Sequence, residues 1–277
     1  MDLGTEQARA HYDAVLAVAA DVVVGLDFDG TLAPIVEDPT RAVIHTDAPD
    51  ALAELAGAVR AVVVITGRPA RQVVELGGLE DLADRLPDGA RLAVMGQYGH
   101  ERWDAASRRF SSPEPPAALQ AFREELPDLL AAEDASDALV EEKGLAVAVH
   151  TRRLPHPQRT FRRLERSLRE AAVRHGLTLE PGRLVLEVRT PGMDKGLAVR
   201  TAVEEYDAGG VVFAGDDLGD VEAFEAVGEL RDSGLPALLV CSSSEEQQAL
   251  ADLADVVVDG PAGVVRLLAG LASDARG

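Results

Sequence analysis

The sequence is poor in cysteine, in aromatic residues and in basic residues. Its 277 residues include one cysteine, Cys241, so the chain cannot form an internal disulfide, and a reducing compartment such as the cytoplasm is expected. Lys and Arg number 27 against 48 Asp and Glu, which gives a formal net charge of -21. A surface of that sign repels a nucleic-acid backbone. It does not exclude a phosphorylated small molecule, because local Lys and Arg can offset the field.

Long hydrophobic runs are missing as well. No uninterrupted apolar stretch reaches the roughly 18 residues of a membrane-spanning helix. The first twenty residues carry charges at Asp2, Glu6, Arg9 and Asp13 and do not have the basic and then apolar pattern of a secretion signal. We therefore expect a cytoplasmic protein with no membrane partner. The apolar share of 47% is that of a folded chain, long enough for one large domain or two modest ones.

An apolar stretch near the start, residues 22–26, ends in two aspartates, Asp27 and Asp29, followed by Gly30. Residues two apart on an extended chain point to the same side, and ligands collect at the carboxyl ends of parallel strands. Two neighbouring carboxylates repel, so they need a cation, a shared proton or a strongly polar setting. The stretch predicts a magnesium-dependent phosphate site with Asp27 as nucleophile. A strand that ends in a solvated acidic turn is the simpler alternative.

Short apolar strands alternate with amphipathic helices on both sides of the middle of the chain. Strands are predicted at 22–26, 61–65, 91–95, 210–214, 237–241 and 256–258. Helices are predicted at 5–20, 48–59, 70–76, 196–206, 221–227, 245–253 and 262–271. This order is typical of an α/β fold with a parallel sheet and crossover helices on both faces.

The rhythm changes after the proline-rich residues 111–116. The following segment reads as helix, strand, strand, helix, strand, strand, with the elements at 117–130, 138–142, 145–151, 158–175, 177–179 and 184–188. Such an order packs as a small α+β module with its helices on one face of an antiparallel sheet. We expect an inserted domain over residues 112–190, between two parts of a core formed by residues 1–111 and 191–277.

Residues suited to phosphoryl transfer stand at other strand ends of the core. They are Thr66, Lys195, Asp216, Asp217 and Asp220. Magnesium takes oxygen ligands, a carboxylate can attack phosphorus, and an ammonium neutralises phosphate charge. Each residue also has an ordinary explanation, as a helix cap, a solvated lysine or a loop carboxylate. Their occurrence together at separate strand ends favours the catalytic interpretation.

These motifs resemble those of the haloacid dehalogenase-type phosphatases. The matching stretches are Asp-Phe-Asp-Gly-Thr-Leu at 27–32, Thr66, Lys195 and Gly-Asp-Asp-x-x-Asp at 215–220. The inserted module resembles the C2B cap of that superfamily. Finer features, at residues 32–39, 65–68, 141–152 and 187–196, are similar to the trehalose-6-phosphate phosphatases.

The resemblance implies a role for each matching residue. Asp27 would be the nucleophile and Asp29 the general acid and base, with Thr66 and Lys195 binding phosphate. Mg²⁺ would be held by Asp27, the backbone carbonyl of Asp29, and Asp216, and oriented by Asp217 and Asp220. Arg68 is implied to bind the substrate, trehalose 6-phosphate. The residues implied to contact its sugar are Glu141, Lys143 and Arg152 in the cap and Glu187 near the end of the cap. A cross-strand charge ladder on an exposed sheet is the alternative for the cap residues.

Other functions stay open at the level of the sequence. A related capped phosphatase could act on sucrose 6-phosphate or mannosyl-3-phosphoglycerate, and a phosphomannomutase would share the core. A receiver-like phospho-acceptor would lack both Asp29 and the inserted module. The sequence also departs from the family pattern, because Gly219 and Val221 stand where many members have threonine and glutamate.

Overall fold

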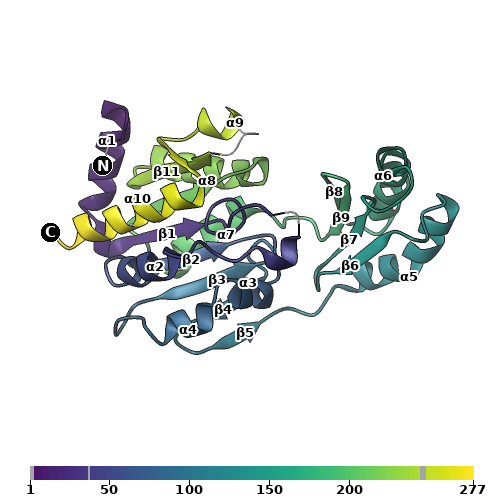
Figure 1. The fold of residues 1–277 in the computed structure, drawn as a ribbon, viewed down its shortest axis with the longest axis horizontal. Helices are drawn as coiled ribbons and strands as arrows, with labels where there is room; N and C mark the ends of the chain where they lie inside the picture. The colour runs from purple at the N-terminus through teal and green to yellow at the C-terminus, as the bar shows by residue number, and fades with distance from the viewer. Residues whose placement is uncertain (1–2, 37, 244–247) are drawn as a thin grey trace. The chain divides into compact units, whose positions relative to one another are not determined.

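The computed structural model describes residues 3–36, 38–243 and 248–277, and it divides the chain into two compact units (Figure 1). Unit 1 comprises Met1–Ser112 and Asp194–Gly277, and unit 2 comprises Pro113–Met193. Unit 2 is therefore an insertion in the chain of unit 1. Glu37, part of a motif singled out above, and the first residues of the helix expected at 245–253 lie outside the described residues.

Unit 1 is built on an eight-stranded sheet in the order β12-β11-β10-β1-β2-β3-β4-β5. The strands are β1 (Val22–Leu26), β2 (Ala61–Ile65), β3 (Leu92–Gly96), β4 (Glu101–Asp104), β5 (Arg109–Ser111), β10 (Gly210–Gly215), β11 (Ala237–Ser243) and β12 (Val256–Asp259). Neighbouring strands from β12 to β3 are parallel, and β4 and β5 add an antiparallel hairpin at one edge. The predicted α/β class with a parallel sheet is confirmed. The edge hairpin was not predicted.

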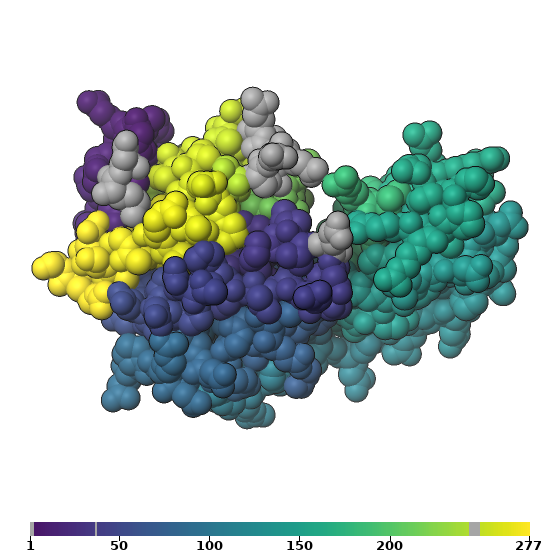
Figure 2. Space-filling model, in the orientation of Figure 1, coloured from purple at the N-terminus to yellow at the C-terminus, as the bar shows by residue number. Residues whose placement is uncertain are grey.

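Helices cover both faces of this sheet, which explains why its central strands are apolar at every position. Val22 and Val24 of β1 pack into the cluster that contains side chains of α1 (Glu6–Leu16), α2 (Ala48–Ala56) and α10 (Gly260–Ala275). Val23 faces the opposite cluster with α7 (Lys195–Glu205) and α8 (Val221–Asp232). The other helices of unit 1 are α3 (Ala70–Leu76), α4 (Leu79–Ala83) and α9 (Gln248–Ala251). Figure 2 shows α10 (yellow) on the surface beside α2 (dark blue), where these two helices contact each other.

The register of the central strands brings the predicted chemistry to one edge of the sheet. Leu26 is level with Val64 of β2 and with Ala214 of β10 in the parallel pairing. The residues that follow these strands therefore emerge together at their carboxyl ends. This is the edge at which open α/β sheets bind ligands.

Unit 2 has a four-stranded antiparallel sheet in the order β6-β7-β9-β8. Its elements are α5 (Ala117–Ala132), β6 (Leu139–Glu142), β7 (Ala146–His150), α6 (Pro157–Arg174), β8 (Thr178–Gly182) and β9 (Val185–Arg189). Val147 of β7 and Leu186 of β9 share a core with Phe122 of α5 and Leu164 of α6. Both helices thus pack on one face of the sheet, as the predicted order of elements requires. Among the described residues, no helix of either unit combines the length and apolarity needed to cross a bilayer.

Candidate active site

Asp27 directly follows β1 and lies buried at the carboxyl edge of the sheet. The residue is 4% exposed, and its backbone amide donates to the carbonyl of Ala214, 2.9 Å away, so the loop begins in register with β10. Burial raises the pKa of Asp27 well above its usual range; Lys195 opposes the shift, and the carboxylates of Asp220 and Asp216 add to it. A buried carboxylate in such surroundings needs positive charge close by.

Lys195 supplies one such charge. It is the first residue of α7, whose N-cap Asp194 accepts a hydrogen bond from the amide of Leu197, and its side chain is buried. The ammonium Nζ donates to Asp27 Oδ1 and to Asp220 Oδ1, each at 2.6 Å. Burial works against the charged form of Lys195, but the carboxylates of Asp220 and Asp27 outweigh it and raise its pKa well above the usual value. These contacts therefore favour the charged form of Lys195 at the site.

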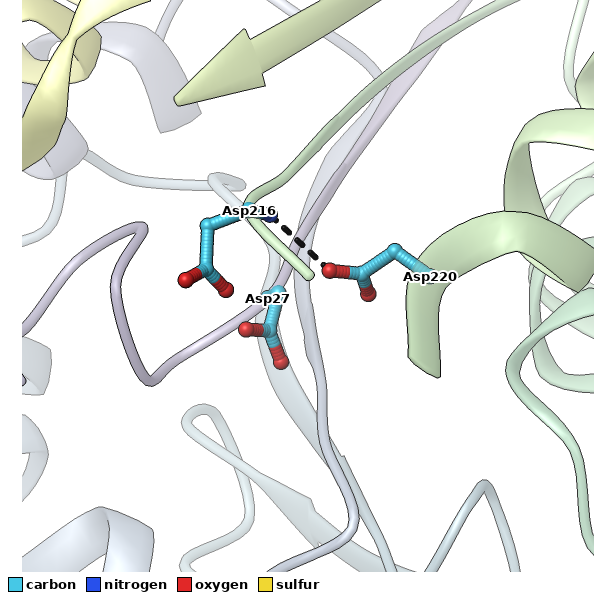
Figure 3. Close-up of side chains that lie close together, drawn as sticks. All are labelled: Asp27, Asp216 and Asp220. Atoms are coloured by element: carbon cyan, nitrogen blue, oxygen red, sulfur yellow. Dashed lines mark hydrogen bonds between the residues drawn. The ribbon is translucent and has the colours of Figure 1, made fainter. Parts of the chain in front are cut away.

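Asp220 connects this lysine to the loop after β10. While its Oδ1 accepts from Lys195, its Oδ2 accepts from the backbone amide of Asp216 at 2.9 Å, the bond drawn in Figure 3, and from that of Asp217 at 3.2 Å. Both oxygens are thus occupied by groups of the protein. Asp220 thus contacts both the loop and the lysine, and the Asp216 side chain points toward Asp27 in Figure 3.

Asp216 has the chemistry of a metal ligand. Its Oδ2 is buried and has no hydrogen-bond partner among the described residues, and carboxylate oxygens of Asp27, Asp216 and Asp220 all lie within 4.8 Å of one another. Burial and the nearby carboxylates of Asp217 and Asp220 raise the pKa of Asp216 to about 8. A divalent cation would complete the coordination of the unpaired oxygen and offset this negative charge, so the donor set fits a metal that prefers oxygen ligands.

Gly30 makes the close approach of Asp216 feasible. Its φ is +74°, a conformation that other residues adopt at a cost. A Cβ at this position would lie 1.9 Å from Asp216 Oδ2. The glycine of the Asp-Phe-Asp-Gly motif therefore both turns the chain and leaves room for the carboxylate from β10.

Asp29 is half-buried and paired with Arg68, which follows β2. Arg68 Nε donates to Asp29 Oδ2 at 2.6 Å, and Arg68 Nη2 donates to Asp29 Oδ1 at 2.7 Å. The third nitrogen, Nη1, donates to the carbonyl of Pro39 at 2.9 Å. Asp29 therefore does not take part in the Asp27, Asp216 and Asp220 cluster through its side chain.

Thr66 and Asp217 stand at the ends of β2 and β10. Thr66 is buried, and its hydroxyl accepts a hydrogen bond from the amide of Arg68 at 3.2 Å. Asp217 is exposed and accepts from the amide of Gly219 at 2.8 Å, which makes it the cap of the short turn Leu218–Asp220. The ordinary role considered for each residue, a local backbone contact, is thus present, and it does not exclude a contact with phosphate.

In unit 2, three of the expected sugar-binding residues lie on the sheet face that the helices leave uncovered. Glu141 of β6 and Glu187 of β9 are level with Ala148 of β7, on either side of it. Lys143 Nζ donates to Glu187 Oε2 at 2.7 Å. Arg152, two residues after β7, is exposed. On this face, the small apolar side chain of Ala148 lies between the charged side chains of Glu141 and Glu187.

Sequence reasoning missed two partners at these places, His150 and Ser242. His150 Nε2 lies 2.9 Å from Glu141 Oε2, and the hydroxyl of Ser242, buried at the end of β11, donates to the carbonyl of Gly30 at 2.6 Å. Because residues two apart on a strand share a face, His150 could have been predicted to lie on the same face as Ala148. The Ser242 contact joins residues 212 apart in sequence, and no local signal announces it.

Known proteins resemble this chain in sequence over most of its length. A family model described as trehalose-phosphatase matches residues 25–258. A trehalose-phosphate phosphatase of Mycobacterium tuberculosis is 30% identical over 265 residues, 94% of this chain and 63% of that protein. A probable trehalose-phosphate phosphatase of Sinorhizobium fredii is 32% identical over 238 residues, 82% of this chain and 83% of that protein.

A solved structure shows the same fold. The C-terminal domain of the Candida albicans trehalose-6-phosphate phosphatase superposes with a TM-score of 0.72 at 18% identity, and the match covers 96% of each chain. The chain spans about 63% of the length of the mycobacterial relatives that it matches.

Proposed function

Because this chain belongs to the trehalose-phosphatase family, we propose that it hydrolyses trehalose 6-phosphate to trehalose and inorganic phosphate with Mg²⁺ as cofactor. The observation that carries the proposal is the buried cluster in which Lys195 binds Asp27 and Asp220, while Asp216 Oδ2 has no hydrogen-bond partner in the part of the chain that the structure describes. A solvated acidic turn would not bury these carboxylates around a lysine.

In the first step, a carboxylate oxygen of Asp27 attacks phosphorus. A bond forms between that oxygen and phosphorus, the bond from phosphorus to the sugar oxygen breaks, and Asp29 gives a proton to the departing sugar oxygen. The Lys195 ammonium, 2.6 Å from Asp27 Oδ1, opposes the raised pKa of Asp27 and favours the ionised nucleophile.

In the second step, water attacks the phosphoryl group on Asp27. Asp29 takes a proton from this water, the bond between phosphorus and the Asp27 oxygen breaks, and phosphate leaves. One carboxylate thus serves first as acid and then as base, which requires it to stay near the phosphoryl group through both steps.

Positive charge stabilises the phosphoryl group during both steps. Lys195 provides an ammonium, and the Thr66 hydroxyl at the end of β2 is proposed as a hydrogen-bond donor to phosphate oxygens. Asp27, the Asp29 backbone carbonyl and Asp216 would hold Mg²⁺. Asp217 and Asp220 would orient the metal without binding it directly. The bound cation would supply further charge neutralisation at the phosphoryl oxygens.

We propose that the uncovered sheet face of unit 2 recognises the sugar. The support is chemical: a disaccharide presents many hydroxyls, which need hydrogen-bond partners when they leave water. The polar side chains proposed for this role are those of Glu141, Lys143, Arg152 and Glu187. The substrate is thus a small molecule, and the single buried cysteine suits a cytoplasmic enzyme.

A panel of sugar phosphates tests the proposal. Phosphate release is measured from trehalose 6-phosphate, sucrose 6-phosphate and mannosyl-3-phosphoglycerate, with Mg²⁺ and with a chelator. We expect trehalose 6-phosphate to be preferred, activity to need Mg²⁺, and Asp27→Asn to be inactive. A preference for another ester would contradict the substrate assignment, and full activity of Asp27→Asn would contradict the nucleophile.

A further inference from the structure

The guanidinium group of Arg68 makes all of its hydrogen bonds described below within unit 1. Its side chain is 13% exposed, whereas that of its partner Asp29 is 41% exposed. Each of its three guanidinium nitrogens donates to the protein, two to the carboxylate of Asp29 and one to the carbonyl of Pro39. The edge of a guanidinium group formed by Nε and Nη2 can donate two parallel hydrogen bonds to a carboxylate or a phosphate. Here it is used on Asp29.

The loop that carries Arg68 is itself held on several sides. The Arg68 amide donates to the Thr66 hydroxyl at 3.2 Å, and the Arg68 carbonyl accepts from the amide of Gln97 at 2.9 Å. The Arg68 guanidinium carbon lies 5.7 Å from the centre of the Phe28 ring. Contacts to backbone, carbonyl and ring together fix where the guanidinium stands.

The turn that holds this loop has an unusual backbone. Gln97 and Tyr98 have φ of 48° and 56°, values in the left-handed region that residues other than glycine seldom adopt. The Tyr98 amide donates to the carbonyl of Thr66 at 2.9 Å, and the Gln97 side chain donates to the carbonyl of Gly67 at 3.1 Å. The left-handed turn thus braces three successive residues, Thr66, Gly67 and Arg68.

We propose that Arg68 is a positioning residue that acts through Asp29, and that it does not bind the phosphate itself. The inference rests on the proposed function, in which Asp29 must give a proton to the sugar oxygen and later take one from water. A half-exposed aspartate left alone would sample several rotamers. Two parallel bonds from a braced guanidinium hold it in one.

Leaving-group dependence separates this role from phosphate binding. A sugar alkoxide needs a proton to depart, whereas p-nitrophenolate leaves readily without one. We therefore expect Arg68→Gln to lower kcat on the best sugar phosphate of the panel by about 100-fold, the loss that a misplaced catalytic group can cause. On p-nitrophenyl phosphate the loss should be much smaller, and KM should change by less than about threefold on both substrates.

Two further variants show whether the effect passes through Asp29. Asp29→Asn should display the same dependence on the leaving group, and adding Arg68→Gln to it should cause little further loss, because residues that act as a unit are not additive. Arg68→Lys keeps the charge but not the two parallel bonds. We expect it to behave like Arg68→Gln on the sugar phosphate.

The chain offers a matched control in Arg60. Arg60 and Asp21 form an ion pair 39 residues apart, as Arg68 and Asp29 do, but before the amino ends of β2 and β1. Arg60→Gln removes the same kind of pair from the same two strands at the far edge. It should leave kcat and KM unchanged on both substrates.

Three results would overturn the inference: a raised KM with equal loss on both substrates, additive losses in the double variant, or wild-type kcat on the sugar phosphate in Arg68→Lys. Arg68→Lys also serves as the readout if Arg68→Gln does not fold, as judged by its circular dichroism. The proposed function fails separately, if the wild-type protein prefers another ester or if Asp27→Asn is active. The inference is still tested in the first of these cases, because the best sugar phosphate is used.

Discussion

At the scale of single residues, the site is defined by charge balance. Lys195 contributes one positive charge against the buried carboxylates of Asp27, Asp216 and Asp220. Since Asp220 spends both oxygens on Lys195 and on backbone amides, the remaining negative charge faces the space between Asp27 and Asp216. A cation in that space would explain why Asp216 Oδ2 is buried with no hydrogen-bond partner among the residues that the structure describes.

The pKa of Asp216 leads to a prediction about pH. The pKa is 3.8 for an ordinary carboxyl and about 8 in the folded protein, so the folded state binds a proton more tightly than the unfolded state does. Stabilisation from this proton is complete below pH 3.8 and is lost as pH rises toward 8. We expect the unfolding free energy of the chelated protein to fall between pH 5 and 8 by more than about 1 kcal/mol from this residue.

Urea unfolding in the presence of a chelator measures this effect. Asp216→Asn removes this titrating group and should make the dependence on pH shallower, and Mg²⁺ should do the same for the wild-type protein. Equal pH dependence in the wild-type and Asp216→Asn proteins would show that Asp216 is ionised throughout the range.

At the scale of elements, the turn after β1 depends on Gly30. Gly30→Ala would place a methyl group against Asp216 Oδ2 at a positive φ, so we expect lost phosphatase activity and a lower melting temperature. Gly89→Ala is the matched control, because Gly89 also has a positive φ, +78°, but no atom lies within 4 Å of its added Cβ. That control should cost about 1 kcal/mol of stability and retain activity. Equal activities in the two variants would argue against close approach of Asp216.

The sheet of unit 2 gives a second prediction at this scale. Glu141 lies on the uncovered face, whereas its neighbour Glu142 pairs with Arg123 of α5, with 2.8 Å between Arg123 Nε and Glu142 Oε2. Glu141→Gln should raise KM for trehalose 6-phosphate about tenfold and leave p-nitrophenyl phosphate unaffected, as loss of one sugar hydrogen bond would. Glu142→Gln should change neither. If both variants lose activity equally, the pair supports the fold and does not read the sugar.

Sequence patterns were most reliable for elements whose burial is uniform. The strand at 61–65 has the predicted bounds because five apolar residues between charged or polar ones leave no other choice. The hairpin of β4 and β5 escaped prediction because only Trp103 is buried among its residues, so no alternation is visible. α4 has five residues, too few for a helical period to show.

The residues of the site also differ in how well the sequence predicts them. The structure brings the predicted residues Asp27, Lys195 and Asp216 together. Asp27 and Asp216 directly follow β1 and β10, whereas Lys195 begins α7. The Arg68 pair with Asp29 and the two-sided role of Asp220 depend on side-chain geometry, for which the sequence offers no period or motif.

At the scale of the whole molecule, the chain collects its site from distant segments. Asp27 and Lys195 are 168 residues apart in sequence and 2.6 Å apart in space, because β1 and β10 are neighbours although unit 2 is inserted between them. The insertion does not interrupt the sheet, because the chain leaves unit 1 after β5 is complete and returns to it before α7 begins. The arrangement separates the proposed chemistry, in unit 1, from the proposed sugar recognition, in unit 2.

The central claim is that Asp27 carries the phosphoryl group of a sugar phosphate. The most direct measurement is mass spectrometry of the acid-quenched protein during turnover of trehalose 6-phosphate with Mg²⁺, compared with phosphate release in the same samples. We predict a phosphoryl adduct on Asp27 of the wild-type protein. The Asp27→Asn variant should show neither this adduct nor phosphate release. Phosphate release by Asp27→Asn at the wild-type rate, or an adduct on another residue, would contradict the account.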